Sequence, residues 1–190
     1  EDLTKSTMPE HPVICSPRFH EPLYNQRVVL EAFRRVITEY PQAELWFLGD
    51  GSQTRELQDL TEKYHLERVR FWGRLSHPEF LKQLASSTVV VSIPSSDATP
   101  VTLLEAMAAG KFPVVSDLPV YRDWITDGVT GLICLIDPDS LAATLRRALS
   151  DQELWRRAAR LNRDLIVAEG IWEDRFQEML ERYKTLVISD

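Results

Sequence analysis

Residues 88–110 read TVVVSIPSSDATPVTLLEAMAAG, and this stretch predicts a strand, a loop and a helix in succession. The run 88–93 is apolar and rich in β-branched residues, which favours a buried strand. Apolar residues then recur at helical spacing: Leu103, Leu104, Met107 and Ala108. Gly110 is typical of a helix end. Asp97 therefore lies in the loop at the carboxyl end of the strand, just before the helix.

The start of this helix has the features of an anion site. Thr99 is a good N-cap and Pro100 suits the first helical position. We therefore expect the free backbone N–H groups of Val101 and Thr102 to face an anion. Glu105 follows on the same helical face, and its side chain leans back toward the helix N-terminus. A phosphate between this acid and the loop acid suggests a sugar nucleotide, although the two acids alone also fit a loop carboxylate and a polar stripe.

Strand-like and helix-like patterns alternate along the whole chain. The expected strands are residues 11–15, 43–48, 69–72, 88–93, 112–115 and 131–136. The expected helices are 26–40, one through Leu57 and Leu60, one opened by a capping box at 76–79, the helix before Gly110, 121–125, 138–149, 152–168 and 171–187. This alternation predicts an α/β fold with a doubly wound parallel sheet of about six strands, Rossmann-like. Ligands bind such sheets beyond the carboxyl ends of the strands, where Arg18, Gly49, Arg74 and Asp97 fall.

Composition narrows the class of protein. The chain has 190 residues, 44% of them hydrophobic, and a net charge of -7. This predicts one domain over residues 1–190, with neither nucleic acid nor an anionic membrane as its partner. No apolar run approaches the roughly 20 residues of a membrane helix. The chain begins without Met or a signal-peptide pattern, so we expect a domain of a longer protein.

Cysteine and histidine spacing gives no metal or redox motif. Cys15 and Cys134 lie far apart in strand-like runs and are expected to be buried thiols of a cytoplasmic protein. The histidines form no ligand cluster, so no metal is expected. Residues 49–52 (GDGS) lack the third glycine of a dinucleotide fingerprint, which argues against an NAD site.

Residues 97–110 resemble the acid-x7-Glu motif and the following Leu-Glu-Ala-Met-Ala-x-Gly helix of the family 4 glycosyltransferases. The resemblance extends from about Val13 to Tyr183. It implies a two-domain GT-B enzyme of which this chain is the C-terminal, donor-binding half. By the same resemblance, Asp97 binds hydroxyls of the donor sugar and Glu105 binds the ribose. The backbone at Thr99, Val101 and Thr102 would bind the sugar and the phosphate.

Other matching positions extend the implied site. Arg18, in SPRF after the first strand, would bind the diphosphate. The family also places a Lys soon after it, but here that position falls on Tyr24 or Asn25. Asn25 would then take the phosphate-binding role or serve only as a helix N-cap. The backbone of the Gly73-Arg74-Leu75 turn would read the base.

Two residues depart from the family pattern. The first acid of the motif is Asp97 where Glu is commoner, and Pro100 lacks an N–H that another residue could donate.

By this resemblance we expect a retaining hexosyltransferase that uses a nucleotide-diphosphate sugar, with UDP as the expected nucleotide, and no metal or cofactor. Arg18 and Asp97 would be its catalytic residues. The acceptor would bind through a missing N-terminal domain, so the isolated domain should be inactive, and the full enzyme could sit peripherally at a membrane. Two alternatives stay open: a sugar-nucleotide 2-epimerase on a similar fold, and a noncatalytic α/β interaction domain, either degenerate or of the receiver type. A receiver, however, needs acids where Arg18 and Arg74 stand.

Overall fold

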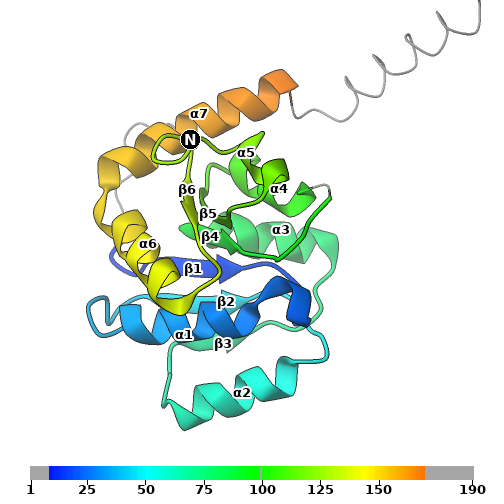
Figure 1. The fold of residues 1–190 in the computed structure, drawn as a ribbon, viewed down its shortest axis with the longest axis vertical. Helices are drawn as coiled ribbons and strands as arrows, with labels where there is room; N and C mark the ends of the chain where they lie inside the picture. The colour runs from blue at the N-terminus through cyan, green and yellow to red at the C-terminus, as the bar shows by residue number, and fades with distance from the viewer. Residues whose placement is uncertain (1–8, 99, 170–190) are drawn as a thin grey trace, which may run out of the picture.

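The structure of this chain is a computed structural model that describes residues 9–98 and 100–169. Within these residues, six strands form one sheet in the order β3-β2-β1-β4-β5-β6 (Figure 1). The strands are β1 (Val13–Ser16), β2 (Glu44–Phe47), β3 (Val69–Phe71), β4 (Val89–Ser92), β5 (Phe112–Ser116) and β6 (Leu132–Cys134). All neighbouring strands pair in parallel. The predicted doubly wound parallel sheet is therefore confirmed.

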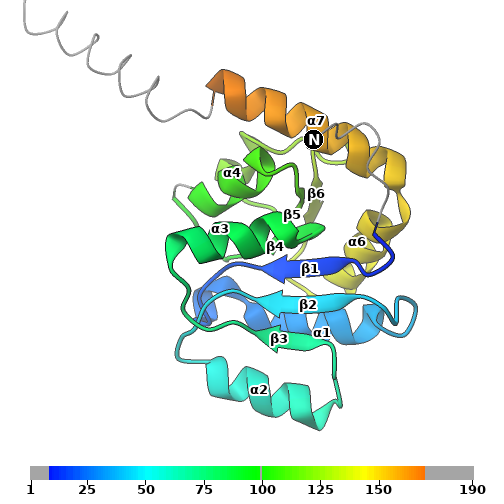
Figure 2. The ribbon, with the colours of Figure 1, turned by 180° about the vertical axis from the view of Figure 1, so that it is seen from behind.

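Helices connect the strands and cover both faces of the sheet (Figures 1 and 2). They are α1 (Gln26–Val36), α2 (Thr54–Lys63), α3 (His77–Ser86), α4 (Val101–Ala108), α5 (Pro119–Arg122), α6 (Pro138–Ser150) and α7 (Gln152–Glu169), with a short 3-10 helix η2 (Pro22–Tyr24) before α1. The capping box predicted at 76–79 is present, because the backbone N–H of Ser76 donates to the Glu79 carboxylate.

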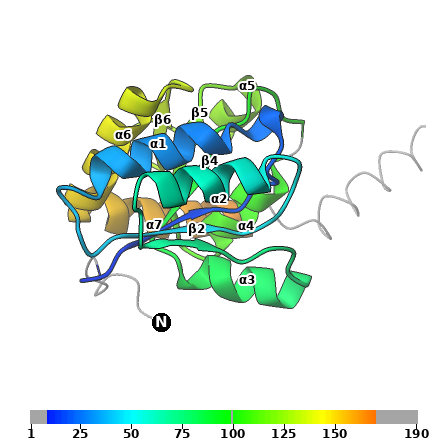
Figure 3. The same ribbon diagram turned by 90° about the horizontal axis from the view of Figure 1, so that it is seen from below.

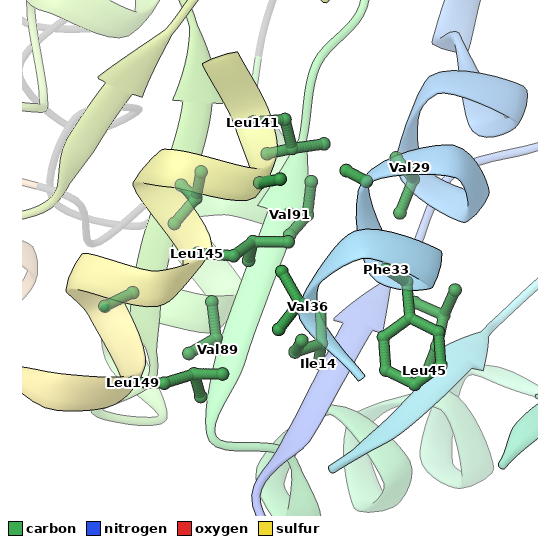
Figure 4. Close-up of a cluster of buried hydrophobic side chains, with 14 of the residues drawn as sticks. Ile14, Val29, Phe33, Val36, Leu45, Val89, Val91, Leu141, Leu145 and Leu149 are labelled. Atoms are coloured by element: carbon green, nitrogen blue, oxygen red, sulfur yellow. The ribbon is translucent and has the colours of Figure 1, made fainter. Parts of the chain in front are cut away.

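The larger core lies between one sheet face and helices α1 and α6 (Figure 4). Ile14 of β1 and Val89 and Val91 of β4 pack against Phe33 of α1 and Leu145 of α6, and all five are buried. The β-branched runs that predicted the strands supply this face, as expected for strands buried on both sides.

The opposite face is covered by α3 and α4, with α7 packed against α4 (Figure 3). Cys15 and Val90 point to this face and contact Leu84 and Ala106. Cys15 and Cys134 are both buried and free, as predicted. Among the described residues, no helix combines the length and apolarity needed to cross a bilayer.

Most strand ends differ from the expected ones by one or two residues, and three helix boundaries also differ. Helix α1 ends at Val36 instead of residue 40. Residues 37–39 continue as turns with Tyr40 still donating to the Val36 carbonyl oxygen, and Pro41 prevents helical backbone beyond this point. Helix α5 begins at Pro119, whose fixed φ suits a first helical turn. Helix α4 begins at Val101 with Pro100 in the N-cap position, so the prediction of Pro100 as the first helical residue was off by one. Thr99 and the helix expected at 171–187 lie outside the described residues.

The strand order creates a switch point between β1 and β4. The chain winds from β1 to β3 in one direction, returns to β4, and then winds to β6 in the other. The loops after β1 and β4 therefore diverge to opposite faces and leave a crevice at the carboxyl edge of the sheet. The chain segments that carry Arg18 and Asp97 border this crevice.

Candidate functional site

A cavity of about 540 Å³ opens at this carboxyl edge. Its walls include five of the side chains singled out in the sequence: Arg18, Arg74, Leu75, Asp97 and Thr102. They come from the loops after β1, β3 and β4 and from the first turn of α4. The fold thus gathers residues that are far apart in the sequence into one hollow.

Arg18 and Asp97 form an ion pair at the switch point. The Arg18 Nη2 atom lies 3.0 Å from Asp97 Oδ2, and each side chain is only 11% exposed. The Arg18 guanidinium also lies 4.5 Å from the centre of the Tyr24 ring. Tyr24, at one of the two positions where the sequence suggested a phosphate-binding Lys, therefore supports the arginine. The site has a fixed cation and a fixed anion side by side.

Two polar residues hold the backbone of this arginine in place. The buried Gln26 donates from Nε2 to the carbonyl oxygen of Arg18 at 2.9 Å, and its own oxygen accepts from the Ser16 hydroxyl. Gly49 adopts φ +152°, and a Cβ there would lie 3.2 Å from the same carbonyl oxygen. The loop after β2 therefore needs glycine at this position, where it approaches the backbone of Arg18.

Glu105 lies on α4, outside the lining of the cavity, and contacts His77. The His77 Nε2 atom is 2.8 Å from Glu105 Oε1, and His77 itself lines the cavity. Val101 is 53% exposed at the first turn of α4, and Thr102 reaches the cavity wall. The first turn of α4 thus borders the same hollow through Thr102.

Of the remaining predicted residues, Arg74 and Leu75 line the cavity and Asn25 does not. Arg74 is largely exposed and approaches Asp50 at 3.4 Å, while Leu75 packs beside Phe80 and Trp72.

Asn25 instead binds the loop that follows β4. Its side-chain amide donates to the carbonyl oxygen of Ile93 and to the Ser95 hydroxyl, both at 2.9 Å. It occupies the N-cap position of α1 with φ 53°, but its side chain makes no cap bond. The structure therefore gives Asn25 a role in holding that loop.

Comparison with known proteins identifies the family. Residues 5–164 match the family described as glycosyl transferases group 1. The chain belongs to this glycosyltransferase family. It is 30% identical over 146 residues to a glycogen synthase of Mycobacterium tuberculosis strain H37Rv, and 29% identical over 161 residues to the N-acetyl-alpha-D-glucosaminyl L-malate synthase of Bacillus anthracis. These matches cover 76% and 83% of the chain but only 35% and 40% of those relatives.

Solved structures show the same fold. HepE of Anabaena, crystallised with UDP and glucose, superposes with a TM-score of 0.84 at 17% identity, covering 93% of this chain and 49% of that one. The catalytic domain of the cholesterol-alpha-glucosyltransferase of Helicobacter pylori superposes with a TM-score of 0.74 at 19% identity, covering 83% of this chain and 98% of that one. The predicted resemblance to GT-B glycosyltransferases is thus confirmed at the level of family and fold.

Tyr121 is a buried partner of Asp97 at this candidate site that the sequence did not reveal. It is fully buried in α5, and its hydroxyl donates to Asp97 Oδ2 at 2.9 Å. The same hydroxyl lies 2.8 Å from the Ser92 hydroxyl at the end of β4. Burial raises the pKa of Tyr121, so the hydroxyl stays a donor. The sequence signal for a role at the site was its position shortly after a strand. A tyrosine among apolar residues otherwise indicates a core residue.

Among the described residues, no group of three or more His, Cys, Asp or Glu side chains could hold a metal ion. His20 is buried beside the site loops and not in a ligand cluster. Its Nδ1 atom lies 2.8 Å from the Thr54 hydroxyl, its ring contacts Phe47 and Phe71 edge-on, and its Nε2 atom has no hydrogen-bond partner. The Thr54 oxygen also accepts from the backbone N–H of Gly51, so His20 ties the β2 loop to the β1 loop.

A change of pH should therefore act on stability through His20. Burial lowers its pKa below 6.5, and the nearby Asp50 and Glu21 only partly oppose this shift. Above pH 6.5 the imidazole is neutral in both states. As pH falls further, the unfolded chain takes up a proton that the folded chain resists, and stability falls by at most about 1.4 kcal/mol per pH unit. Chemical denaturation between pH 7 and 5 should show a shallower fall for His20→Gln than for the native protein. An equal slope in both would contradict the assignment, and the exposed His11→Gln serves as control.

Glu105 is expected to contact the ligand through a charge-assisted hydrogen bond. Glu105→Gln should weaken nucleotide binding by roughly 1–3 kcal/mol, because the neutral amide is a poorer acceptor for a ribose hydroxyl. The fold should survive, since the side chain is partly exposed and its partner His77 is at the surface. Titration calorimetry with UDP measures the loss, and unchanged affinity would refute the ribose contact.

Proposed function

We propose that this chain is the donor-binding half of a retaining hexosyltransferase that transfers a sugar from a UDP-sugar to an acceptor hydroxyl. The observation that carries the proposal is the cavity at the β1/β4 switch point, where Arg18, Asp97 and the first turn of α4 converge. The site supplies a cation and free N–H groups for a diphosphate, and carboxylates for hydroxyls.

The diphosphate is assigned to Arg18 and the N-terminus of α4. The backbone N–H groups of Val101 and Thr102 have no partner inside the helix, and the helix dipole favours negative charge there. Tyr24 stacks on the guanidinium and holds it at the cavity wall. These groups would stabilise the charge that develops on the departing diphosphate. They provide the positive charge from protein atoms, so we propose binding without a metal or cofactor.

The two acids are assigned to the two sugars of the donor. Asp97 lies before the helix and would bind hydroxyls of the hexose, while Glu105 lies one turn inside α4 and would bind the ribose. The turn at Arg74 and Leu75 would contact the base. In transfer with retention, the acceptor oxygen bonds to the anomeric carbon as the bond to the phosphate oxygen breaks. The departing phosphate oxygen, on the same sugar face, takes the acceptor proton.

Two findings on related proteins support the choice of donor and the division of labour. HepE and the Staphylococcus aureus protein TarM, which share this fold, were crystallised with UDP, and HepE also with UDP-glucose. The chain spans 37%, 35% and 40% of the length of the mannosyltransferase, glycogen synthase and malate synthase relatives that it matches. We therefore assign acceptor binding to a part of the protein outside this chain, and turnover to the full-length protein in the cytoplasm or peripherally at a membrane.

A binding screen tests the proposal. UDP-, GDP- and ADP-sugars would each be titrated into the full-length protein and into this chain, with and without a chelator. We expect UDP to bind the full-length protein and this chain with the same affinity, and the same for a UDP-sugar, whether or not the chelator is present. Only the full-length protein should transfer sugar. Failure of every nucleotide sugar to bind the full-length protein would refute the proposed function, and loss of binding in the chelator would refute metal independence.

A further inference from the structure

One oxygen of Asp97 serves two partners. Its Oδ2 atom accepts from Tyr121 at 2.9 Å and lies 3.0 Å from Arg18 Nη2, while Oδ1 accepts from the backbone N–H of Ala98 at 3.0 Å. The two partners of Oδ2 differ in their surroundings. Arg18 lines the cavity on a long side chain, whereas Tyr121 is fully buried below it.

Binding of a diphosphate would change these two contacts in different ways. If Arg18 binds the diphosphate, as the proposed function holds, its guanidinium turns its strongest hydrogen bonds toward the phosphate oxygens. The approaching negative charge also repels the Asp97 carboxylate at short range. Asp97 then loses its cationic partner at the moment when it must face the sugar. A second anchor is needed to keep the carboxylate in place.

Tyr121 has the properties of that anchor. Its ring belongs to a small core cluster with Leu103, Met107, Val115 and Ile125, which fixes it between α4 and β5. An ionised carboxylate accepts only, so the tyrosine proton points to Asp97 and the Ser92 hydroxyl donates to the tyrosine oxygen. The three side chains form a directed chain of hydrogen bonds, in which each bond strengthens the next.

We propose that Tyr121 is a positioning residue. It holds Asp97 in its sugar-binding orientation when the Arg18 guanidinium leaves Asp97 and binds the diphosphate. This inference rests on the proposed function. The two neighbours of Asp97 then have different roles. Arg18 exchanges Asp97 for the diphosphate during donor binding, whereas Tyr121 stays hydrogen-bonded to Asp97 throughout.

The variant Tyr121→Phe in the full-length protein tests the inference, because it removes the hydroxyl and keeps the ring. We expect the dissociation constant for UDP to change less than about twofold. The additional affinity that a UDP-sugar has over UDP should fall by about tenfold, and kcat for transfer should fall by a similar factor. Calorimetry with both ligands and steady-state kinetics give these values. A Tyr121→Phe protein that keeps native sugar discrimination and kcat would overturn the proposal.

A matched control separates this role from a general loss of stability. Tyr64, directly after α2, also donates to a carboxylate, that of Glu31 on α1, at 2.8 Å, and neither residue lines the cavity. Tyr64→Phe should leave both affinities and kcat unchanged. Ser92→Ala keeps the Tyr121 ring and hydroxyl but removes its donor, so it should lower sugar discrimination in the same direction and less than Tyr121→Phe does. An unchanged Ser92→Ala protein would count against the directed chain.

A double-variant cycle tests whether Tyr121 acts through Asp97. If it does, Tyr121→Phe should add almost nothing in an Asp97→Ala background. Fully additive effects would overturn the positioning role. A native protein that binds no UDP-sugar more tightly than UDP would instead refute the assigned sugar site itself, so the two failures are distinguishable.

Discussion

Arg18→Met is expected to weaken UDP binding by about 100-fold or more, because two charge-assisted hydrogen bonds to phosphate are each worth about 1.5–3 kcal/mol. Methionine keeps much of the apolar stem that packs on Tyr24. Asp97 keeps its bonds from Tyr121 and Ala98, so the loop after β4 should stay in place. Titration calorimetry on the full-length protein measures the loss.

Arg34→Met is the matched control for this loss. Arg34 also stacks on a tyrosine, Tyr64, at 4.6 Å and pairs with a carboxylate, Glu31, at 3.3 Å. It lies on α1 away from the cavity, so its replacement should leave UDP affinity unchanged. Equal effects of the two substitutions would show that Arg18 has no special role toward phosphate.

Asp97→Ala is expected to change nucleotide binding and sugar transfer in opposite directions. Removing the carboxylate releases Arg18 from its largely buried ion pair, so UDP affinity should rise by about two- to tenfold, because the guanidinium no longer gives up a partner to bind phosphate. Loss of the hydroxyl contacts should lower kcat/KM for transfer by about 100-fold or more. Calorimetry and initial-rate kinetics on the same preparation separate the two effects.

Asp59→Ala provides the comparison, because Asp59 is ion-paired with Arg55 at 3.0 Å on the exposed side of α2. It should change neither UDP affinity nor transfer. Equal losses for UDP and UDP-sugar in Asp97→Ala would show that Asp97 maintains the phosphate loop and does not select the sugar.

Most of the fold was predictable because its signals are local. The β-branched runs at 88–93 and 112–115 form the strands β4 and β5, and helical periodicity marks the intervening helix. Helix ends were less predictable, since they depend on single residues such as Pro100 before α4 and Pro119 at the start of α5. The position of Asn25 shows the same limit: its sequence context fits a phosphate contact or a cap, and the folded chain places it at the N-cap of α1 with its side-chain amide bonded to the β4 loop.

The chemistry of the site was only partly predictable. Motif spacing placed Asp97 and Glu105 around the start of a helix, and the structure brings that helix to the cavity. The Arg18–Asp97 ion pair, however, depends on β1 lying next to β4, which no local pattern reports. The roles of Tyr121 and Gln26 were not predicted, because buried polar groups act through hydrogen-bond partners that only the folded chain brings together.

The central claim is that Arg18 binds the diphosphate and Asp97 the sugar of one donor molecule in the β1/β4 crevice. A crystal structure of the full-length protein with an intact UDP-sugar tests it most directly. We predict phosphate oxygens on the Arg18 guanidinium and at the N-terminus of α4, and hexose hydroxyls on Asp97, with the bond from Tyr121 to Asp97 retained. A nucleotide bound elsewhere, or bound in the crevice with the Arg18–Asp97 ion pair unchanged and no phosphate on Arg18, would contradict the account.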